Sequence, residues 1–271
     1  MRKLPKALLL AAFIGLLGSH GVALAQAPAA PEPAKAPEPA PEHTFTGKVA
    51  LYTEYEYRGI SQTSEKPAAQ LNLDYAHASG IYVGTFLSNI KWLKDTAEAN
   101  GFTTSANLEW DIYAGYKFEV VKDWTLDLGY LRYEYPSSGA FNPKPNTDEV
   151  YAGLSYGPAT LKYSYSFNNT FGVPESKGSD YLELSVNYPV IDKVTLNAVL
   201  GHQRYKGSQI HGFHNGDLSY TVWKLGATYD FGNGFNVGAY YKGTDAEEAL
   251  YTVKGKDWSK ERLVAFVSYS F

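Results

Sequence analysis

Cysteine is absent from this chain of 271 residues, and methionine occurs only once. Without cysteine the protein can form neither a disulfide nor a thiolate metal site. A strong excess of either charge is also absent, because 24 Lys and Arg stand against 28 Asp and Glu, which gives a net charge of −4. This balance excludes the basic surface that nucleic-acid binding requires, so no nucleic-acid partner is expected.

Long apolar runs are missing as well. Beyond the first 25 residues, no stretch reaches the ~18 consecutive apolar residues that a membrane-spanning helix needs. The chain is instead rich in tyrosine (23 residues) and glycine (25 residues), and aromatic residues make up 15% of it. This composition favours β-strands and tight turns. A membrane barrel stays compatible with it, because barrels place their apolar residues at alternate positions that an average over the sequence hides.

The C-terminal segment, 261–271, alternates with the period of a strand. Its apolar face carries Leu263, Ala265, Val267, Tyr269 and Phe271. Chain ends usually fray, so a terminus written as a full strand predicts that another strand pairs with it. The simplest partner is the first strand of the fold, and that pairing would close a barrel.

The first 25 residues have the pattern of a secretory signal peptide. A basic start with Arg2 and Lys3 precedes an apolar core, 7–17, and the small residues Ala23-Leu24-Ala25 form a cleavage site. We expect cleavage after Ala25. Residues 26–44 are rich in proline and alanine and favour an extended polyproline conformation. They are interpreted as a periplasmic linker, and a spacer without a partner is favoured over a tether.

Residues 45–271 form a series of about twelve short alternating runs, an even number as membrane barrels have. The first run is expected to extend from Lys48 to Arg58, with Lys48 on its inner face. In the fifth run the apolar positions change phase between Tyr130 and Leu131, which predicts a β-bulge. Short turns follow the even-numbered runs and long polar loops follow the odd-numbered ones, as an up-and-down barrel with short periplasmic turns and long outer loops requires.

Aromatic residues collect near both ends of the runs and bracket an aliphatic middle. Two such rows match the interfacial girdles of a membrane barrel. The turn-side row is Tyr75, Phe118, Trp124, Tyr156, Tyr188, Phe231 and Phe235, and the loop-side row is Tyr57, Trp110, Tyr135, Phe167, Trp223 and Tyr241. The opposite face of the runs carries too many charges for a dry core. The sequence therefore predicts an all-β, transmembrane, antiparallel up-and-down barrel with lipid outside and a charged lumen.

Several motifs strengthen this interpretation. They are YRGISQT at 57–63, DYAHASG at 74–80, EWDIYAGY at 109–116, RYEYP at 132–136 and TDEVYAGLSY at 147–156. Together they resemble the TorF family of bacterial proteins, proposed porins that were once known only as proteins of unknown function. The resemblance spans the expected barrel but not the linker. It implies an outer-membrane location and a diffusion channel, and it carries no catalytic residues.

The charged residues of the inner face are the candidate pore lining. They are Glu54, Glu56, Arg58, Asp74, Glu109, Asp111, Lys117, Asp127, Glu149, Lys162, Glu183, Lys224, Lys242 and Arg262. Most acidic members lie on the second to eighth strands, and Lys224, Lys242 and Arg262 lie on the tenth to twelfth. A closed barrel would set acids against bases across the pore, which can orient polar solutes. The alternative is a charge network that only fills the barrel.

Two further patterns point to chemistry only weakly. Glu109 and Asp111 lie about 7 Å apart on one strand face, a separation suited to paired carboxylates, but a charged lumen produces such pairs by chance. His211 and His214 lie in a glycine-rich loop without a third metal ligand. No nucleophile motif or phosphate loop is present. We therefore expect no enzyme, no metal and no cofactor.

The expected function is passive diffusion of small hydrophilic solutes or ions through the outer membrane of a Gram-negative bacterium. The alternative is an occluded barrel that acts structurally or binds partners through its long loops. Expected partners are outer-membrane lipid, the solutes, and the outer-membrane assembly machinery, which would read the C-terminal strand through Tyr269 and Phe271. Whether the long loop 90–106 folds into the lumen is left open by the sequence.

Overall fold

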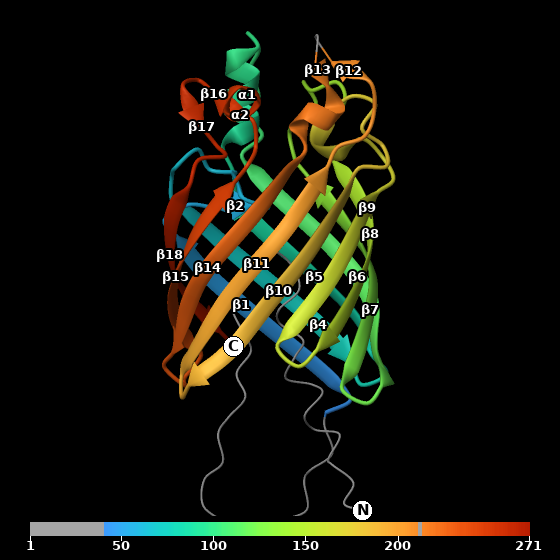
Figure 1. Ribbon diagram of the computed structural model, residues 1–271, viewed down its shortest axis with the longest axis vertical. Coiled ribbons are helices and arrows are strands. Elements are labelled where there is room, and N and C mark those ends of the chain that lie inside the picture. The colour runs from blue at the N-terminus through green and yellow to red at the C-terminus, as the bar shows by residue number, and fades with distance from the viewer. Residues whose placement is uncertain (1–40, 211–212) are drawn as a thin grey trace, which may run out of the picture.

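The computed structural model describes residues 41–210 and 213–271, so the expected signal peptide, most of the expected linker and His211 lie outside the described residues. The described chain forms one closed antiparallel barrel of twelve strands (Figure 1). The strands are β1 His43–Tyr52, β4 Ala68–His77, β5 Ile81–Asn89, β6 Leu108–Val121, β7 Trp124–Glu134, β8 Thr147–Tyr156, β9 Ala159–Ser166, β10 Asp180–Ile191, β11 Val194–Arg204, β14 Tyr220–Asp230, β15 Phe235–Thr244 and β18 Arg262–Ser270. Each pairs with its neighbour along the chain.

The barrel closes between its first and last strands, as the C-terminal alternation predicts. Strand β1 pairs with β18 in a register that places Lys48 opposite Ser270 and Tyr52 opposite Phe266. Beyond β18, the backbone N–H of Phe271 donates to the carbonyl of Gly47 over 2.9 Å, and the Gly47 N–H donates back over 2.8 Å. The terminal aromatic is therefore part of the seam, and the twelve described strands of the barrel have no free edge.

The connections are sorted by length, in agreement with the sequence. Tight turns lie at one end of the barrel and the long loops gather at the other, where they form short elements of their own (Figure 1). These elements are β2 Glu56–Tyr57, β3 Ile60–Ser61, α1 Trp92–Ala99, η3 Thr170–Gly172, β12 Gln209–Ile210, β13 Phe213–His214, η4 Asn215–Leu218, α2 Glu248–Tyr251, β16 Thr252–Val253 and β17 Lys256–Asp257. The loop 90–106 carries α1 at this end.

Among the described residues, none of the helices has the length and apolar character needed to cross a bilayer.

The outer wall is apolar and exposed. Leu51, Leu225 and Leu263 each expose 60% or more of their surface, and soluble proteins rarely expose apolar patches of that extent. The wall is therefore the lipid-facing surface of a transmembrane barrel. Eleven of the thirteen predicted girdle residues avoid the buried core, but Tyr57 and Tyr135 do not. Tyr135 is only 2% exposed and Tyr57 is half-buried, packed against lumen residues.

Tyrosine and glycine face each other inside the barrel, which explains why both are abundant. Gly129 on β7 lies opposite Tyr151 on β8, and a β-carbon at Gly129 would overlap the Tyr151 ring. The missing side chain gives the ring a place against the wall. Its hydroxyl pairs with that of Tyr82, which donates to Asp127 over 2.6 Å. Buried hydroxyls thus find polar partners.

Two local predictions are wrong. The register of β7 runs without a break through Tyr130 and Leu131, and the irregularity lies on β6 between Glu119 and Val121. The apparent phase change arises because Leu131 points inward and is 3% exposed within a cluster of lumen aromatics. The first strand also ends at Tyr52, not at residue 58. The chain beyond it turns into the barrel.

Candidate functional site

The segment 53–67, named here the inward hairpin, folds into the barrel between β1 and β4. Strands β2 and β3 pair through Tyr57 and Ile60, which leaves Arg58 and Gly59 as a two-residue turn. Both turn residues have positive φ, 47° and 83°, as a type I′ hairpin requires. A side chain at Gly59 would meet Val222 and Thr244 at 2.6 Å. Glycine therefore allows the tip of the hairpin to touch the wall.

One side of the inward hairpin contacts the acidic arc of the wall, from β4 to β10. The guanidinium of Arg58 donates to both carboxylate oxygens of Glu149 on β8, over 3.1 and 2.8 Å, and to the side-chain oxygen of Gln203 on β11 over 2.8 Å. The hydroxyl of Tyr55 donates to Glu109 on β6. These partners are buried, and charge-assisted bonds of this kind are the stronger ones.

The other side of the inward hairpin contacts the basic arc, β14, β15 and β18. Lys224 on β14 forms an ion pair with Glu56. The Lys242 ammonium, which is fully buried, donates to the backbone carbonyls of Gly59 over 2.7 Å and Lys260 over 2.6 Å. The hairpin therefore offers an anion to the basic wall and a cation to the acidic wall, and it bridges the two.

Arg262 extends the basic contact toward the base of the hairpin. Its Nε lies 3.5 Å from a carboxylate oxygen of Glu54, and its Nη2 lies 2.7 Å from one of Glu65. Glu54 also accepts a hydrogen bond from Ser61 within the hairpin. The two carboxylates fasten both arms of the hairpin to the last strand.

The structure thus brings the predicted charges together in a way that the sequence did not predict. Most acids and bases lie on separate arcs of the wall, with Lys117 on β6 and Lys162 on β9 as the exceptions. Glu149, Lys224, Lys242 and Arg262 reach the inward hairpin and not each other. Glu54, Glu56 and Arg58, expected on the first strand, lie in the hairpin because β1 ends earlier.

The remaining candidates lie on the wall, mostly beside tyrosines. Asp74 accepts from Tyr113, Asp127 from Tyr82, Glu183 from Tyr181, and Glu109 from Tyr55 and Tyr135. The Lys162 ammonium lies 3.9 Å from the centre of the Tyr151 ring, and Lys117 is half-buried on β6. Asp111 keeps one buried carboxylate oxygen without a hydrogen-bond partner in the described chain.

Two lumen residues were left out of the predicted site. Lys48 on β1 is 6% exposed, and its ammonium has no hydrogen-bond partner among the described residues; the alternation placed it on the inner face, but it was not included in the site. Gln203 was assigned to the inner face but not to the site. Arg58 was predicted, but its place in a turn was not; Gly59 beside it has a positive φ and was the available turn signal.

The outer loops hold the inward hairpin from above. The Asp95 carboxylate on α1 accepts from Ser64 over 2.6 Å and from Lys91 over 2.8 Å, and it lies 3.6 Å from the Lys254 ammonium. Burial raises the pKa of Asp95, but the bonds from Lys91 and Ser64 and the charge of Lys254 outweigh it and leave the pKa below its ordinary value. Lys256 donates to the Ser64 carbonyl over 2.9 Å.

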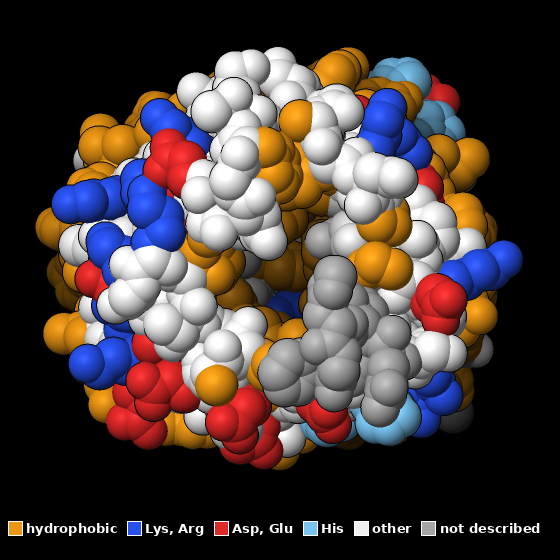
Figure 2. Space-filling view, turned by 90° about the horizontal axis from the view of Figure 1, so that it is seen from above, with side chains coloured by type: hydrophobic (Ala, Val, Ile, Leu, Met, Phe, Trp, Pro, Cys, Tyr) orange, Lys and Arg blue, Asp and Glu red, His pale blue; other side chains and the backbone are white. Residues whose placement is uncertain are grey.

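A cavity of about 260 Å³ lies above the tip of the hairpin, at the loop end of the barrel. We name it the vestibule. Figure 2 shows a hollow in the centre of this face, with apolar side chains around its rim. The residues that line it come from the hairpin, α1, the η3 and η4 loops, β11, β14, α2, β16 and the segment after β17, and they include Arg58, Trp92, Tyr220, Tyr251 and Trp258.

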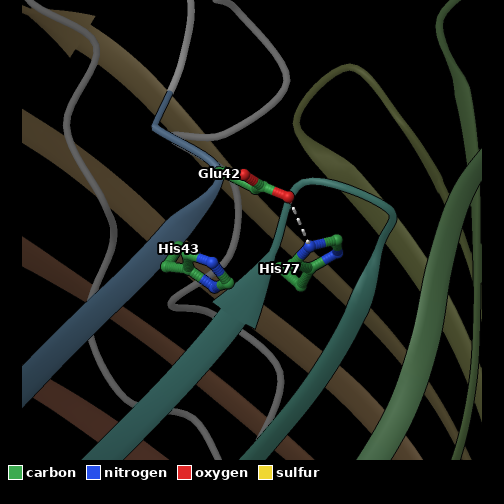
Figure 3. Close-up of side chains that lie close together, drawn as sticks. All are labelled: Glu42, His43 and His77. Atoms are coloured by element: carbon green, nitrogen blue, oxygen red, sulfur yellow. Dashed lines mark ion pairs between the residues drawn. The ribbon is translucent and has the colours of Figure 1, made fainter.

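A second cluster lies at the turn end. Glu42, His43 and His77 place one ligand atom each within 4.8 Å of one another, and Glu42 lies 3.4 Å from His77 (Figure 3). Register pairing of β1 with β4 sets the two histidines opposite each other. Three donors of these types can bind a divalent cation, although structural zinc sites use four. The two histidines that the sequence singled out are not part of this cluster: His214 lies in the loop after β11, and His211 lies outside the described residues.

Comparisons with solved structures place the fold among porins. A NanC porin structure superposes with a TM-score of 0.56 at 12% sequence identity, covering 84% of this chain and 99% of that one. The KdgM porin superposes with a TM-score of 0.53 at 10% identity, covering 83% and 99%. A second KdgM structure, in complex with disordered oligogalacturonate, gives 0.52 at 10% identity, covering 84% and 98%. At these identities the likeness establishes a shared fold.

Sequence comparison gives a family but no characterised relative. No curated protein matches the chain. A family described as "Bacterial protein of unknown function (Gcw_chp)" matches residues 36–271, which include the whole barrel. The chain therefore belongs to the Gcw_chp family of bacterial proteins.

Proposed function

We propose that this protein is an outer-membrane channel for the passive diffusion of small hydrophilic solutes or ions, and that the inward hairpin narrows its bore. The observation that carries the proposal is the inside-out distribution of side chains. The outer wall exposes leucines, whereas the lumen contains charges from both arcs of the wall. A barrel built only as a structural body has no need for a charged interior, because buried charges are costly unless they are paired.

The similar fold of solved porins supports the same function. The NanC and KdgM structures are porins, and one was solved with an oligogalacturonate. The resemblance to the TorF family points in the same direction. We propose that the long loops face the outside of a Gram-negative cell, that the signal peptide is removed after Ala25, and that the assembly machinery reads Tyr269 and Phe271.

The pore lining in this proposal is the predicted set of charged residues together with Lys48. Solutes enter through the vestibule and pass beside the inward hairpin. Glu56 and Arg58 replace the facing charges expected across an open pore, because the hairpin places an anion and a cation in the middle of the lumen. A polar solute therefore meets both signs of charge along its path.

Swelling of proteoliposomes tests the proposal. Vesicles that contain the purified protein are diluted into isotonic solutions of neutral solutes of increasing size, and solute entry is followed by light scattering. The channel predicts fast swelling with the smallest solutes and a steep decline with size, since the hairpin leaves little room. Protein-free vesicles and vesicles with the same amount of an unrelated folded barrel are the controls. No swelling with any solute would contradict the proposal.

An occluded barrel is a second candidate, and one observation favours it. The ion pair of Arg58 with Glu149 and the contacts of Lys242 are buried, and together they fasten the inward hairpin to both walls. If the hairpin never leaves the lumen, the barrel is closed to solutes. The long loops are then the surface through which the protein binds partners. Silence in planar-bilayer recordings at high protein density, with native folding demonstrated in parallel, would favour this candidate over the channel.

A further inference from the structure

The vestibule is lined by two tryptophans whose indole N–H groups are buried. Trp258, which precedes β18, is 7% exposed, and Trp92 begins α1. Neither Nε1 has a hydrogen-bond partner among the described residues, and both rings line the vestibule. Buried indole N–H groups usually have an acceptor. Two such donors beside one cavity point to a ligand that supplies acceptor oxygens.

The walls around these donors are flat aromatic surfaces. Tyr220 and Tyr251 pack edge to face with ring centres 5.4 Å apart, and Trp92 packs perpendicular to Tyr135 at 5.5 Å. The Tyr251 hydroxyl is occupied, because it donates to the carbonyl of Leu218 over 2.6 Å. These contacts fix the rings in place. A fixed aromatic wall with a few polar groups is typical of a small-molecule site.

Charge restricts the ligand further. Within the lining that the structure describes, Arg58 is the one charged residue, and its guanidinium already binds both oxygens of Glu149. A cation would approach this guanidinium without a carboxylate in the lining to stabilise it. An anion would have to compete with Glu149 for Arg58. A neutral ligand needs no counter-charge in the lining and does not compete with Glu149 for Arg58.

We propose that the vestibule binds one ring of a neutral saccharide as it enters from outside. The apolar C–H face of a pyranose ring packs against the aromatic wall, while Trp92 and Trp258 donate hydrogen bonds to its oxygens. A volume of about 260 Å³ lies just below the usual range for ligand pockets, ~300–1,000 Å³, which suits a single ring. This inference deepens the proposed function, on which it rests, by naming a class of solute at the outer mouth.

Calorimetric titration of the intact, detergent-solubilised protein tests the inference. D-glucose, D-galacturonate and D-glucosamine share a pyranose ring and differ in charge. The expected result is binding of glucose that is at least fivefold tighter than binding of either charged sugar. No measurable binding of glucose at saturating concentrations, or equal or tighter binding of a charged sugar, would overturn the inference.

Conservative variants locate the site. Trp258→Phe and Trp92→Phe keep an aromatic ring and remove the N–H donor, and each is expected to weaken glucose binding at least fivefold. Trp124→Phe is the matched control, because Trp124 lies on the outer wall near the turn end, and its affinity should equal that of the wild type. Heat-modifiable migration on gels confirms that each variant is folded. Unchanged affinity in both vestibule variants would overturn the inference.

Glucose binding and solute entry together distinguish failure of the saccharide site from failure of the proposed channel. Glucose binding without any solute entry into proteoliposomes would contradict the channel and leave the saccharide site standing. Solute entry at the wild-type rate without glucose binding would leave the channel standing and remove the saccharide site.

Discussion

Arg58 at the tip of the inward hairpin and Glu149 on β8 form a two-pronged ion pair, with distances of 3.1 Å and 2.8 Å. Their side chains are 7% and 2% exposed. On the opposite wall, Lys224 pairs with Glu56, two residues before Arg58. A short turn thus carries opposite charges to opposite sides of the lumen, and the charge pattern of the wall determines where the hairpin lies.

Removal of the Glu149 charge should release the hairpin tip. In Glu149→Gln, the buried Arg58 loses its counter-charge, and breaking such a pair costs about 3–5 kcal/mol. We expect trypsin to cleave after Arg58 at least tenfold faster than in the wild type, with the product identified by mass spectrometry. Glu175→Gln, which changes an exposed loop carboxylate, is the control. Equal cleavage of Glu149→Gln and the wild type would show that the pair does not hold the tip.

Lys242 should act, within the pore lining, as a clamp on the inward hairpin. Its ammonium is 0% exposed and donates to the carbonyls of Gly59, Ser259 and Lys260. Lys242→Met leaves these acceptors without a donor, at about 1–3 kcal/mol for a buried unsatisfied group. We expect faster amide hydrogen exchange at 59–61 and 258–260. Lys122→Met, in an exposed turn, should leave exchange unchanged, and equal exchange in both variants would rule out the clamp.

Acidification should loosen α1 from the hairpin through Asp95. The pKa of Asp95 lies below its ordinary value in the folded protein, whereas an unfolded aspartate titrates near ~3.9. Its contribution to stability is therefore complete above that pH and is lost as the pH falls through the lower folded value. We expect amide exchange in α1, corrected for intrinsic rates, to rise between pH 5 and pH 2.5. The same rise in Asp95→Asn would show that other groups cause it.

A charge on the outer wall should disrupt the barrel if that wall meets lipid. Leu225 lies in the middle of β14 and is 60% exposed. Arginine at the centre of the bilayer costs about 2–4 kcal/mol in a barrel, so Leu225→Arg should lower the free energy of unfolding from lipid vesicles by that amount. Leu225→Ala separates loss of size from gain of charge. A loss in Leu225→Arg no larger than in Leu225→Ala would place this wall away from lipid.

The barrel could be predicted because its side chains alternate between lipid and lumen with a fixed period of two residues. Alternation at every strand, the parity of loop lengths and the aromatic C-terminus each follow from a two-faced wall with lipid on one side, and the structure has these features. The acidic and basic arcs could be predicted for the same reason. Once the order of the strands in the barrel is known, Glu149 and Lys224 must lie on different sides of the lumen.

The inward hairpin was not predicted, because alternation cannot distinguish a wall strand from a hairpin that folds inside. Tyr55 and Tyr57 continue the apolar phase of β1, but they pack against lumen residues such as Phe86 and Tyr133. The one local signal was Gly59, because glycine suits the positive φ of the second position in a type I′ turn, whereas Arg58 at the first position is an uncommon residue for a positive φ.

The vestibule could not be predicted from the sequence. It joins Trp92 to Trp258 through loops that are distant in the sequence, and loops have no period from which contacts can be inferred. Only the closed barrel brings these loops to the same end. The site could therefore be assigned once the topology was known, but not from the residues alone.

Single-channel conductance of the wild type beside a variant with a shortened hairpin tests the central claim most directly. Tyr52 and Ala68 are register partners, so a four-residue Gly-Ser turn can replace residues 54–65 without moving β1 or β4. If the hairpin narrows a conducting lumen, the wild type opens in small steps and the shortened variant opens in steps several times larger. Equal steps in the two proteins, or no current from a correctly folded shortened variant, would contradict the account.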